Sequence, residues 1–291
     1  MPNVRANGID LEYEEIGDPT ARPLLLIMGL GAQLIAWDDE FCRQLADRGF
    51  RVIRFDNRDV GLSTKIEAGK VSFIEAIAKG LAGEPIEAPY TLDDMADDAA
   101  ALLDVIGIEA AHVVGASMGG MIAQTMAIQH PEKVLSLTSI MSTTGEPSVG
   151  QPTGEAMAVL MNRPAGDRQS VVEVHVAAQR IIGSPAHFDE QRVREKSAAA
   201  YDRCFYPIGF GRQIVAIAAS GTRAERLQEV GVPALVIHGT DDPLIQPSGG
   251  SHTAEMIPGA ELLMLEEMGH DLPAHYWPQV IDAIEKLAAQ A

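Results

Sequence analysis

The chain has 291 residues, of which 46% are apolar and 22% charged, a composition typical of a folded globular protein and not of a disordered or fibrous one. Its formal net charge of −19 argues against nucleic acid and anionic membranes as partners, because such polyanions attract clustered Lys and Arg. A chain of this length is expected to form one domain with an insertion.

The spacing of the cysteines and the composition of residues 1–10 indicate in which cellular compartment the protein is expected. Cys42 and Cys204 lie far apart and form no C-x-x-C pair, so neither a disulfide framework nor a zinc site is indicated. Residues 1–10 contain no apolar run behind a basic stretch, and no apolar segment has the length of a membrane span. We therefore expect a cytoplasmic protein with no membrane partner, no metal and no cofactor, whose oligomeric state the sequence does not indicate.

Short apolar runs alternate with helical patterns along most of the chain. Residues 3–16 are expected to form an antiparallel hairpin that turns at Asn7-Gly8, because this pair readily adopts positive φ angles. The later runs are too apolar to have a solvated face. They are expected to be strands at 23–28, 51–55, 111–115, 134–140, 233–238 and 260–265. The alternation predicts an α/β fold with a doubly wound, mostly parallel sheet of eight strands.

A helix is expected over residues 92–106. Thr91 precedes it as a candidate N-cap and Gly107 follows its end. Four aspartates, at 93, 94, 97 and 98, fall opposite an apolar face and are interpreted as a solvated surface of the helix, not as a metal site.

The alternation of strands and helices stops after residue 141. Helical patterns follow at 154–162, 171–182 and 190–204, with no convincing buried strand. We interpret residues 142–221 as a helical cap inserted into the sheet domain, whose two parts are residues 1–141 and 222–291.

A G-x-S-x-G motif supplies the candidate nucleophile. It spans residues 115–119, with Ser117 at its centre, directly after an expected strand and before an apolar helical run at 121–128. In that context the motif predicts a nucleophile elbow, a sharp turn that presents the serine while small neighbours let strand and helix approach.

A serine hydroxyl needs a neutral imidazole within hydrogen-bond reach, and a carboxylate to orient that imidazole. The strand at 233–238 leads into Asp241, Asp242 and Pro243, and the strand at 260–265 leads toward His270. Both loops follow the carboxyl end of a strand, where open α/β sheets place their sites. We predict a triad of Ser117, Asp242 and His270, with Asp241 as the alternative acid.

These features resemble those of the α/β-hydrolase fold family. Besides the elbow, residues 56–63 (DNRDVGLS) are similar to the family's D-x-R-x-x-G-x-S turn, and residues 238–243 (HGTDDP) to its acid loop. The resemblance implies the α/β-hydrolase fold and aligns the acid with Asp242, the residue before Pro243.

Within the family, several segments resemble the aclacinomycin methylesterase group. They are Met28-Gly29-Leu30, Trp37, Asp39-Glu40-Phe41, Asn57-Arg58-Asp59, Ala116-Ser117-Met118-Gly119 and Gly269-His270-Asp271-Leu272-Pro273. This resemblance implies hydrolysis of a carboxylic ester, with a methyl ester as one candidate. It covers the sheet domain better than the insertion, so no substrate identity is carried over.

Acyl transfer also needs hydrogen-bond donors for the oxyanion. The candidates are the backbone N–H groups of Met118, which opens a helix, and of Leu30. Many family members have His-Gly where this chain has Met28-Gly29, a departure that concerns the shape of the loop and not the amide donor.

The substrate pocket is the least readable part of the sequence. Its candidate residues, which could equally be ordinary core, are Gly29, Trp37, Met157, Met161, Phe205, Tyr206 and Phe210. We expect a serine hydrolase that cleaves esters of small to medium apolar substrates through an acyl-enzyme. The alternatives are a perhydrolase or cofactor-free haloperoxidase, a lactonase or a carbon–carbon bond hydrolase of the same fold, and a non-catalytic ligand-binding module.

Overall fold

Eight strands form one sheet in the computed structural model, which describes residues 3–68, 75–76, 79, 84–162 and 166–291. Their order is β1-β2-β4-β3-β5-β6-β7-β8; β2 is antiparallel to both β1 and β4, and the other neighbours are parallel. The bounds are β1 Asn3–Ala6, β2 Ile9–Ile16, β3 Arg22–Ile27, β4 Phe50–Phe55, β5 Ala111–Ala116, β6 Val134–Ile140, β7 Ala234–Gly239 and β8 Glu261–Leu265. The predicted α/β fold with a mostly parallel eight-stranded sheet is confirmed.

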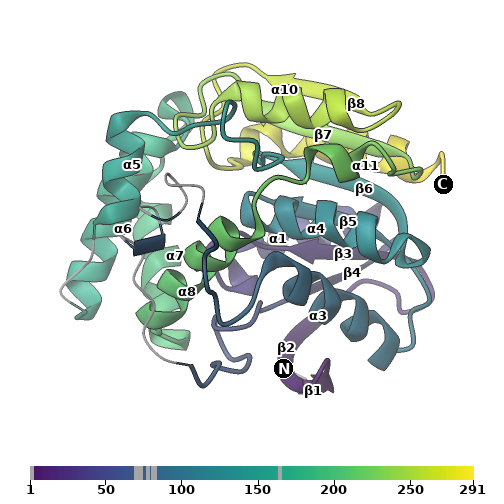
Figure 1. Ribbon diagram of the computed structural model, residues 1–291, viewed down its shortest axis with the longest axis horizontal. Helices are drawn as coiled ribbons and strands as arrows, with labels where there is room; N and C mark the ends of the chain where they lie inside the picture. The colour runs from purple at the N-terminus through teal and green to yellow at the C-terminus, as the bar shows by residue number, and fades with distance from the viewer. Residues whose placement is uncertain (1–2, 69–74, 77–78, 80–83, 163–165) are drawn as a thin grey trace.

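Helices cover both faces of the sheet (Figure 1). In β3, Leu25 and Ile27 join the core under α3 and α4, while Leu24 and Leu26 join the core under α1 and α11. This alternation is why the strand is apolar throughout. The helices are α1 Asp39–Asp47, α3 Leu92–Val105, α4 Met118–Gln129, α5 Gly154–Met161, α6 Arg168–Ile182, α7 Glu190–Arg203, α8 Pro207–Ser220, α9 Ala224–Leu227, α10 Pro247–Met256 and α11 Trp277–Ala288.

Helix α3 begins with the expected cap, and Asp94 completes a capping box with Thr91. The interpretation of its aspartates as a solvated surface is wrong for Asp98, which is buried. Its carboxylate accepts two hydrogen bonds from the guanidinium of Arg58, at 2.6 and 2.7 Å. A buried guanidinium needs such a partner, and the helical pattern could not reveal one that lies 40 residues away.

In the described part of the chain, four cap helices, α5 to α8, lie between β6 and β7 in sequence and stand beside the sheet (Figure 1). Three of them occupy the segments where helical patterns were recognised. The fourth, α8, was not predicted, because Gly209 and Gly211 weaken its helical pattern. Gly209 is required by packing: a Cβ built there would lie 2.0 Å from the carbonyl oxygen of Asp59.

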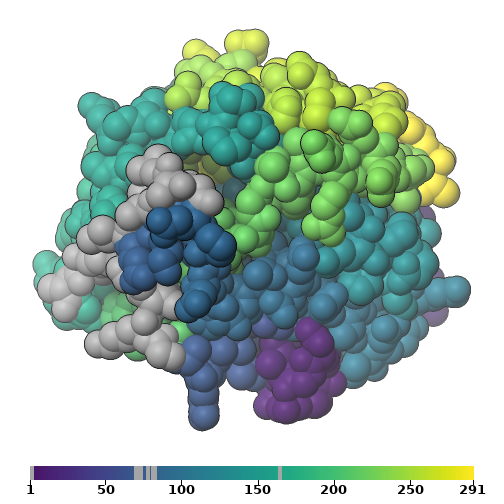
Figure 2. Space-filling view, viewed as in Figure 1, coloured from purple at the N-terminus to yellow at the C-terminus, as the bar shows by residue number. Residues whose placement is uncertain are grey.

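The two ends of the cap meet at the sheet domain. The N–H of Arg223 donates to the carbonyl of Thr144 at 2.8 Å, and a Cβ on Gly145 would lie 2.5 Å from the carbonyl oxygen of Gly221. The chain just before α5 also meets α10, where the N–H of Gly150 donates to the hydroxyl oxygen of Ser248. In Figure 2 teal and yellow-green segments lie against each other at the top of the view. The division at residues 141 and 221 stays a prediction.

No helix in the part of the chain that the structure describes combines the length and the apolar character needed to cross a bilayer.

Candidate active site

Ser117 lies at a sharp turn between β5 and α4. Its φ of 56° and ψ of −120° are unusual for a residue with a side chain, and a Cβ on Gly119 would lie 2.0 Å from the carbonyl oxygen of Ile27. The strained backbone is held by its neighbours: Ser117 N–H donates to Ile140 at 2.9 Å, and the Ser142 hydroxyl donates to the Ser117 carbonyl at 2.8 Å. The local sequence therefore forms the expected elbow.

Three side chains from separate loops converge at this turn. Nε2 of His270 is 2.9 Å from Oγ of Ser117, and Nδ1 of His270 is 2.7 Å from Oδ2 of Asp242. With its Nδ1–H donated to the carboxylate, the neutral imidazole leaves Nε2 free to accept the serine proton. The structure thus brings together all three residues predicted to form the triad.

The two neighbouring aspartates of the acid loop differ in position. Oδ1 of Asp242 accepts hydrogen bonds from the N–H groups of Leu244 and Ile245, both at 2.9 Å, and its side chain is fully buried. Asp241 is exposed, and its carboxylate accepts from the hydroxyl of Thr240 at 3.0 Å. Asp242, and not Asp241, is therefore the carboxylate beside His270.

A second buried imidazole lies next to Asp242. Nε2 of His238 donates to the carbonyl of Ile245 at 2.7 Å and is 3.5 Å from Oδ2 of Asp242. Burial lowers the pKa of His238, so its imidazole stays neutral and does not compete with His270 as a cation.

The loop after β3 runs directly against the nucleophile. A Cβ built on Gly29 would lie 3.1 Å from Cβ and 3.6 Å from Oγ of Ser117, so only glycine fits without displacement. The carbonyl of Gly29 accepts from the N–H of Ala32 at 3.2 Å. In a planar trans peptide the N–H points opposite to the C=O, so the Leu30 N–H is directed away from that turn.

The cap anchors the loop that carries His270. The N–H of His270 donates to the carbonyl of Ile182 at 2.6 Å, and the N–H of Gly269 donates to the hydroxyl of Ser184 at 2.9 Å. Asp271 in turn accepts from Ser184 N–H at 3.0 Å and from Nε2 of Gln179 at 2.9 Å. These contacts join residues more than 80 positions apart, so no local pattern could indicate them.

The candidate pocket residues are spread over the molecule. Gly29 lies against Ser117, while Trp37 stacks on Phe41 at 5.8 Å between ring centroids within the core. The remaining five lie on the cap and its helix junctions: Met157 and Met161 are exposed on α5, Phe205 stacks on Tyr201, the Tyr206 hydroxyl accepts from Arg212, and Phe210 lies against Gly31.

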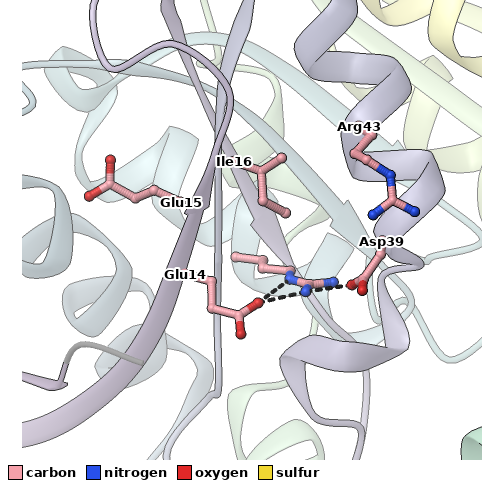
Figure 3. Close-up of a pocket in the computed structure, with 6 residues that line it drawn as sticks. Glu14, Glu15, Ile16, Asp39 and Arg43 are labelled. Atoms are coloured by element: carbon pink, nitrogen blue, oxygen red, sulfur yellow. Dashed lines mark hydrogen bonds and ion pairs between the residues drawn. The ribbon is translucent and has the colours of Figure 1, made fainter.

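A surface hollow lies elsewhere, between β2, β4 and α1 (Figure 3). The guanidinium of Arg54 spans it, donating to Glu14 and Asp39 at 2.5 to 2.8 Å. The charge of Arg54 is therefore paired, and the hollow contains none of Ser117, Asp242 and His270.

The thiol of Cys42 is buried near this ion pair. Its burial raises the pKa of the thiol to about 12, which keeps the thiol protonated and unreactive.

Comparison with known proteins gives consistent matches over nearly the whole chain. The family model described as alpha/beta hydrolase fold matches residues 22–273. The rhodomycin D methylesterases DauP, of a Streptomyces species, and DnrP, of Streptomyces peucetius, are 34% and 33% identical to this chain over 287 residues, each covering 91% of this chain and 90% of the relative.

Solved structures agree in fold. A meta-cleavage product hydrolase from Pseudomonas fluorescens matches with a TM-score of 0.79 at 19% identity, covering 100% of this chain and 98% of that chain. At this level of identity the likeness extends to the fold alone.

Proposed function

Since this chain belongs to the α/β-hydrolase fold family and is an ester-cleaving hydrolase, we propose that it acts through Ser117 as nucleophile, His270 as general base and Asp242 as the acid that orients the imidazole. The observation that carries this assignment is the unbroken hydrogen-bonded path from Oγ of Ser117 through both ring nitrogens of His270 to Oδ2 of Asp242. A path of this kind activates an otherwise weak nucleophile.

The reaction follows from these positions in two steps. His270 accepts the proton of Ser117 as Oγ attacks the ester carbonyl, and Asp242 stabilises the imidazolium that forms. The imidazolium then gives its proton to the leaving alcohol, which departs from the acyl-enzyme. In the second step, the same imidazole takes a proton from water as the water attacks the acyl carbonyl. It then gives that proton to Oγ of Ser117 as the acid departs, which restores the free serine.

We assign the oxyanion hole to the backbone N–H groups of Leu30 and Met118. Met118 is the first residue of α4, where a helix has no internal acceptor for its N–H. The Leu30 amide is carried by the loop that lies against Ser117. Together they would place two donors beside the carbon under attack.

The proposed substrate is a carboxylic ester of a small to medium-sized, largely apolar acid, with a methyl ester as the preferred bond. The relatives DauP and DnrP, named as rhodomycin D methylesterases, support a small alcohol as leaving group. The acyl part is proposed only at the level of class, because the segments that resemble the methylesterase group lie outside residues 142–221, the cap that must enclose it.

Labelling and turnover together test the assignment. The wild-type protein should react with a fluorophosphonate at Ser117, as located by mass spectrometry, and should hydrolyse p-nitrophenyl butyrate and methyl esters. Ser117→Ala should abolish labelling and reduce kcat by about a millionfold, to the level left by binding alone. Labelling of Ser117→Ala at an unchanged rate would refute the assignment of Ser117 as the nucleophile.

Each alternative reaction of this fold is tested with its own substrate. A lactone tests the lactonase, a vinylogous diketone tests the carbon–carbon bond hydrolase, and peroxide with a carboxylic acid tests the perhydrolase. Faster turnover of any of these than of every ester would favour the corresponding alternative reaction. Absence of all turnover and labelling in the folded wild type would favour a binding module.

We also propose that the enzyme works in the cytoplasm on a small molecule. Cys42 and Cys204 both have free thiols in the structure, which suits a reducing compartment. Fractionation of cells that produce the protein, with a cytoplasmic marker enzyme as reference, tests the location.

A further inference from the structure

Helix α8 of the cap packs on the two loops that border the nucleophile. The ring of Phe210 fills the space beside Gly31, where a Cβ would lie 2.7 Å from its Cδ2. One turn further along the same helix, the side chain of Gln213 is fully buried. A polar side chain in such a place needs partners for both ends of its amide.

Gln213 finds both partners in the backbone of the sheet domain. Its Oε1 accepts from the N–H of Gly31 at 2.8 Å, and its Nε2 donates to the carbonyl of Arg58 at 2.9 Å. One amide therefore joins the loop after β3 to the turn after β4, and it comes from the cap.

The other end of the loop is held from the same turn. Nδ2 of Asn57, itself buried, donates to the carbonyl of Met28 at 2.9 Å. Asn57 precedes Arg58, the residue whose carbonyl Gln213 holds. The turn after β4 thus acts at both ends of the loop, directly through Asn57 and indirectly through Gln213.

The hydrogen bonds at the Met28 carbonyl and the Gly31 N–H lie on either side of the peptide that joins Gly29 to Leu30. Met28 O belongs to the peptide plane between residues 28 and 29, and Gly31 N–H to the plane between residues 30 and 31. Because peptide planes are rigid, the plane between them, which carries the Leu30 N–H, can turn only about the backbone dihedrals of Gly29 and Leu30. That plane also carries the Gly29 carbonyl, which accepts from the N–H of Ala32 at 3.2 Å and so resists a flip of the peptide. Fixing both outer planes together with this hydrogen bond sets the direction of the Leu30 N–H.

We propose that Gln213 is a positioning residue of the oxyanion hole, and that docking of α8 through its amide completes the hole by setting the direction of the Leu30 N–H. The proposal rests on the function proposed above. It makes the cap part of the machinery for the chemical step as well as a cover for the substrate.

The decisive variant is Gln213→Met, which keeps the length of the side chain and removes both hydrogen bonds. The oxyanion exists only in the transition state and the tetrahedral intermediate, so kcat should fall about 10- to 100-fold while KM changes by less than about threefold. The rate of fluorophosphonate labelling should fall with kcat. The final amount of label bound per protein gives the fraction of molecules with a folded active site. We therefore express kcat per labelled site.

A purely structural role predicts a different result. Misfolding would lower the end point of labelling and the unfolding temperature but leave kcat per labelled site unchanged. Gln213→Asn provides a second variant that keeps the amide in the core, yet is one methylene too short to reach both Gly31 and Arg58; it should show the same loss of kcat.

The matched control is Arg192→Gln. It removes an ion pair between α7 and Asp38, the residue just before α1. This contact between cap and sheet domain does not involve residues 28–31, and kcat should stay within about twofold of wild type. Asn57→Ala should resemble Gln213→Met, and the double variant should lose less than the product of the two, since both act on one loop.

Three outcomes would count against one proposal or the other. Normal kcat per labelled site in both Gln213→Met and Gln213→Asn, with Ser117→Ala inactive, would overturn the role of Gln213 and leave the triad intact. An active Ser117→Ala would refute the proposed function itself. An equal loss of kcat in Arg192→Gln and Gln213→Met would mean that general loosening of the cap, and not the Leu30 amide, is responsible.

Discussion

The two adjacent aspartates of the acid loop offer a test with a built-in comparison. Asp242→Asn keeps the shape of the side chain but can present an NH₂ group to His270, which would force the wrong tautomer. We expect kcat to fall about 10³- to 10⁴-fold. Asp241→Asn, which changes the charge by the same amount one residue earlier, should leave kcat within about twofold. Steady-state hydrolysis of p-nitrophenyl butyrate measures both, and equal losses would show that the acid has been assigned wrongly.

At the residue scale, the sequence was informative where chemistry demands particular side chains. The elbow around Ser117 was recognisable because a strained turn between a strand and a helix requires small neighbours. Asp242 was preferred over Asp241 only through the family resemblance, whereas the structure separates them by burial and by the two amides that hold Asp242. The sequence did not indicate the contact of His238 with Asp242, because it depends on how the acid loop folds back.

At the scale of elements, the contact between the cap and the His270 loop predicts a kinetic effect. Asp271→Asn must turn an NH₂ group toward either Ser184 or Gln179, both of which donate to it now. The loosened loop should misplace the imidazole and lower kcat about 10-fold. Stopped-flow or steady-state kinetics would detect this change.

The control for this variant is Glu190→Gln, which removes one negative charge from an exposed ion pair on the cap. Its kcat should match that of the wild type, since exposed pairs contribute little. If Asp271→Asn also matched the wild type, the anchoring of the loop by the cap would have no role in catalysis.

Strands and helices could be predicted where their apolar residues follow the spacing typical of that element. The strands of the sheet were recognised because burial on both faces makes them continuously apolar. Helix α8 was missed because Gly209 serves close packing against Asp59 and not helix formation, so tertiary contact overrides the local signal. Gln213 was missed with it, since an isolated glutamine gives no sign that it will be buried.

At the scale of the whole molecule, the buried His112 links stability to pH. Burial lowers the pKa of His112 from 6.5 to about 4. Below pH 6.5 the unfolded chain takes up a proton that the folded chain refuses, so the free energy of unfolding decreases as the pH falls, and this loss levels off near pH 4. The group should contribute up to about 3 kcal/mol to the loss.

Urea denaturation of wild type and His112→Gln at several pH values between 7 and 4 isolates this contribution. Glutamine does not titrate, so the decrease in the free energy of unfolding should be smaller in the variant, even if its stability at pH 7 is lower. Parallel curves for the two proteins would show that His112 is not the group responsible.

The meeting of the cap's two ends at Thr144 and Arg223 bears on how such an enzyme can diversify. A segment whose entry and exit are hydrogen-bonded neighbours can be exchanged for another of different length without disturbing the strands on either side. Specificity could thus be replaced as a unit, by recombination in nature or by grafting in the laboratory. A transplanted cap would also have to supply a side-chain amide that binds Gly31. Without that amide, the recipient enzyme would gain a new substrate specificity but would turn over more slowly.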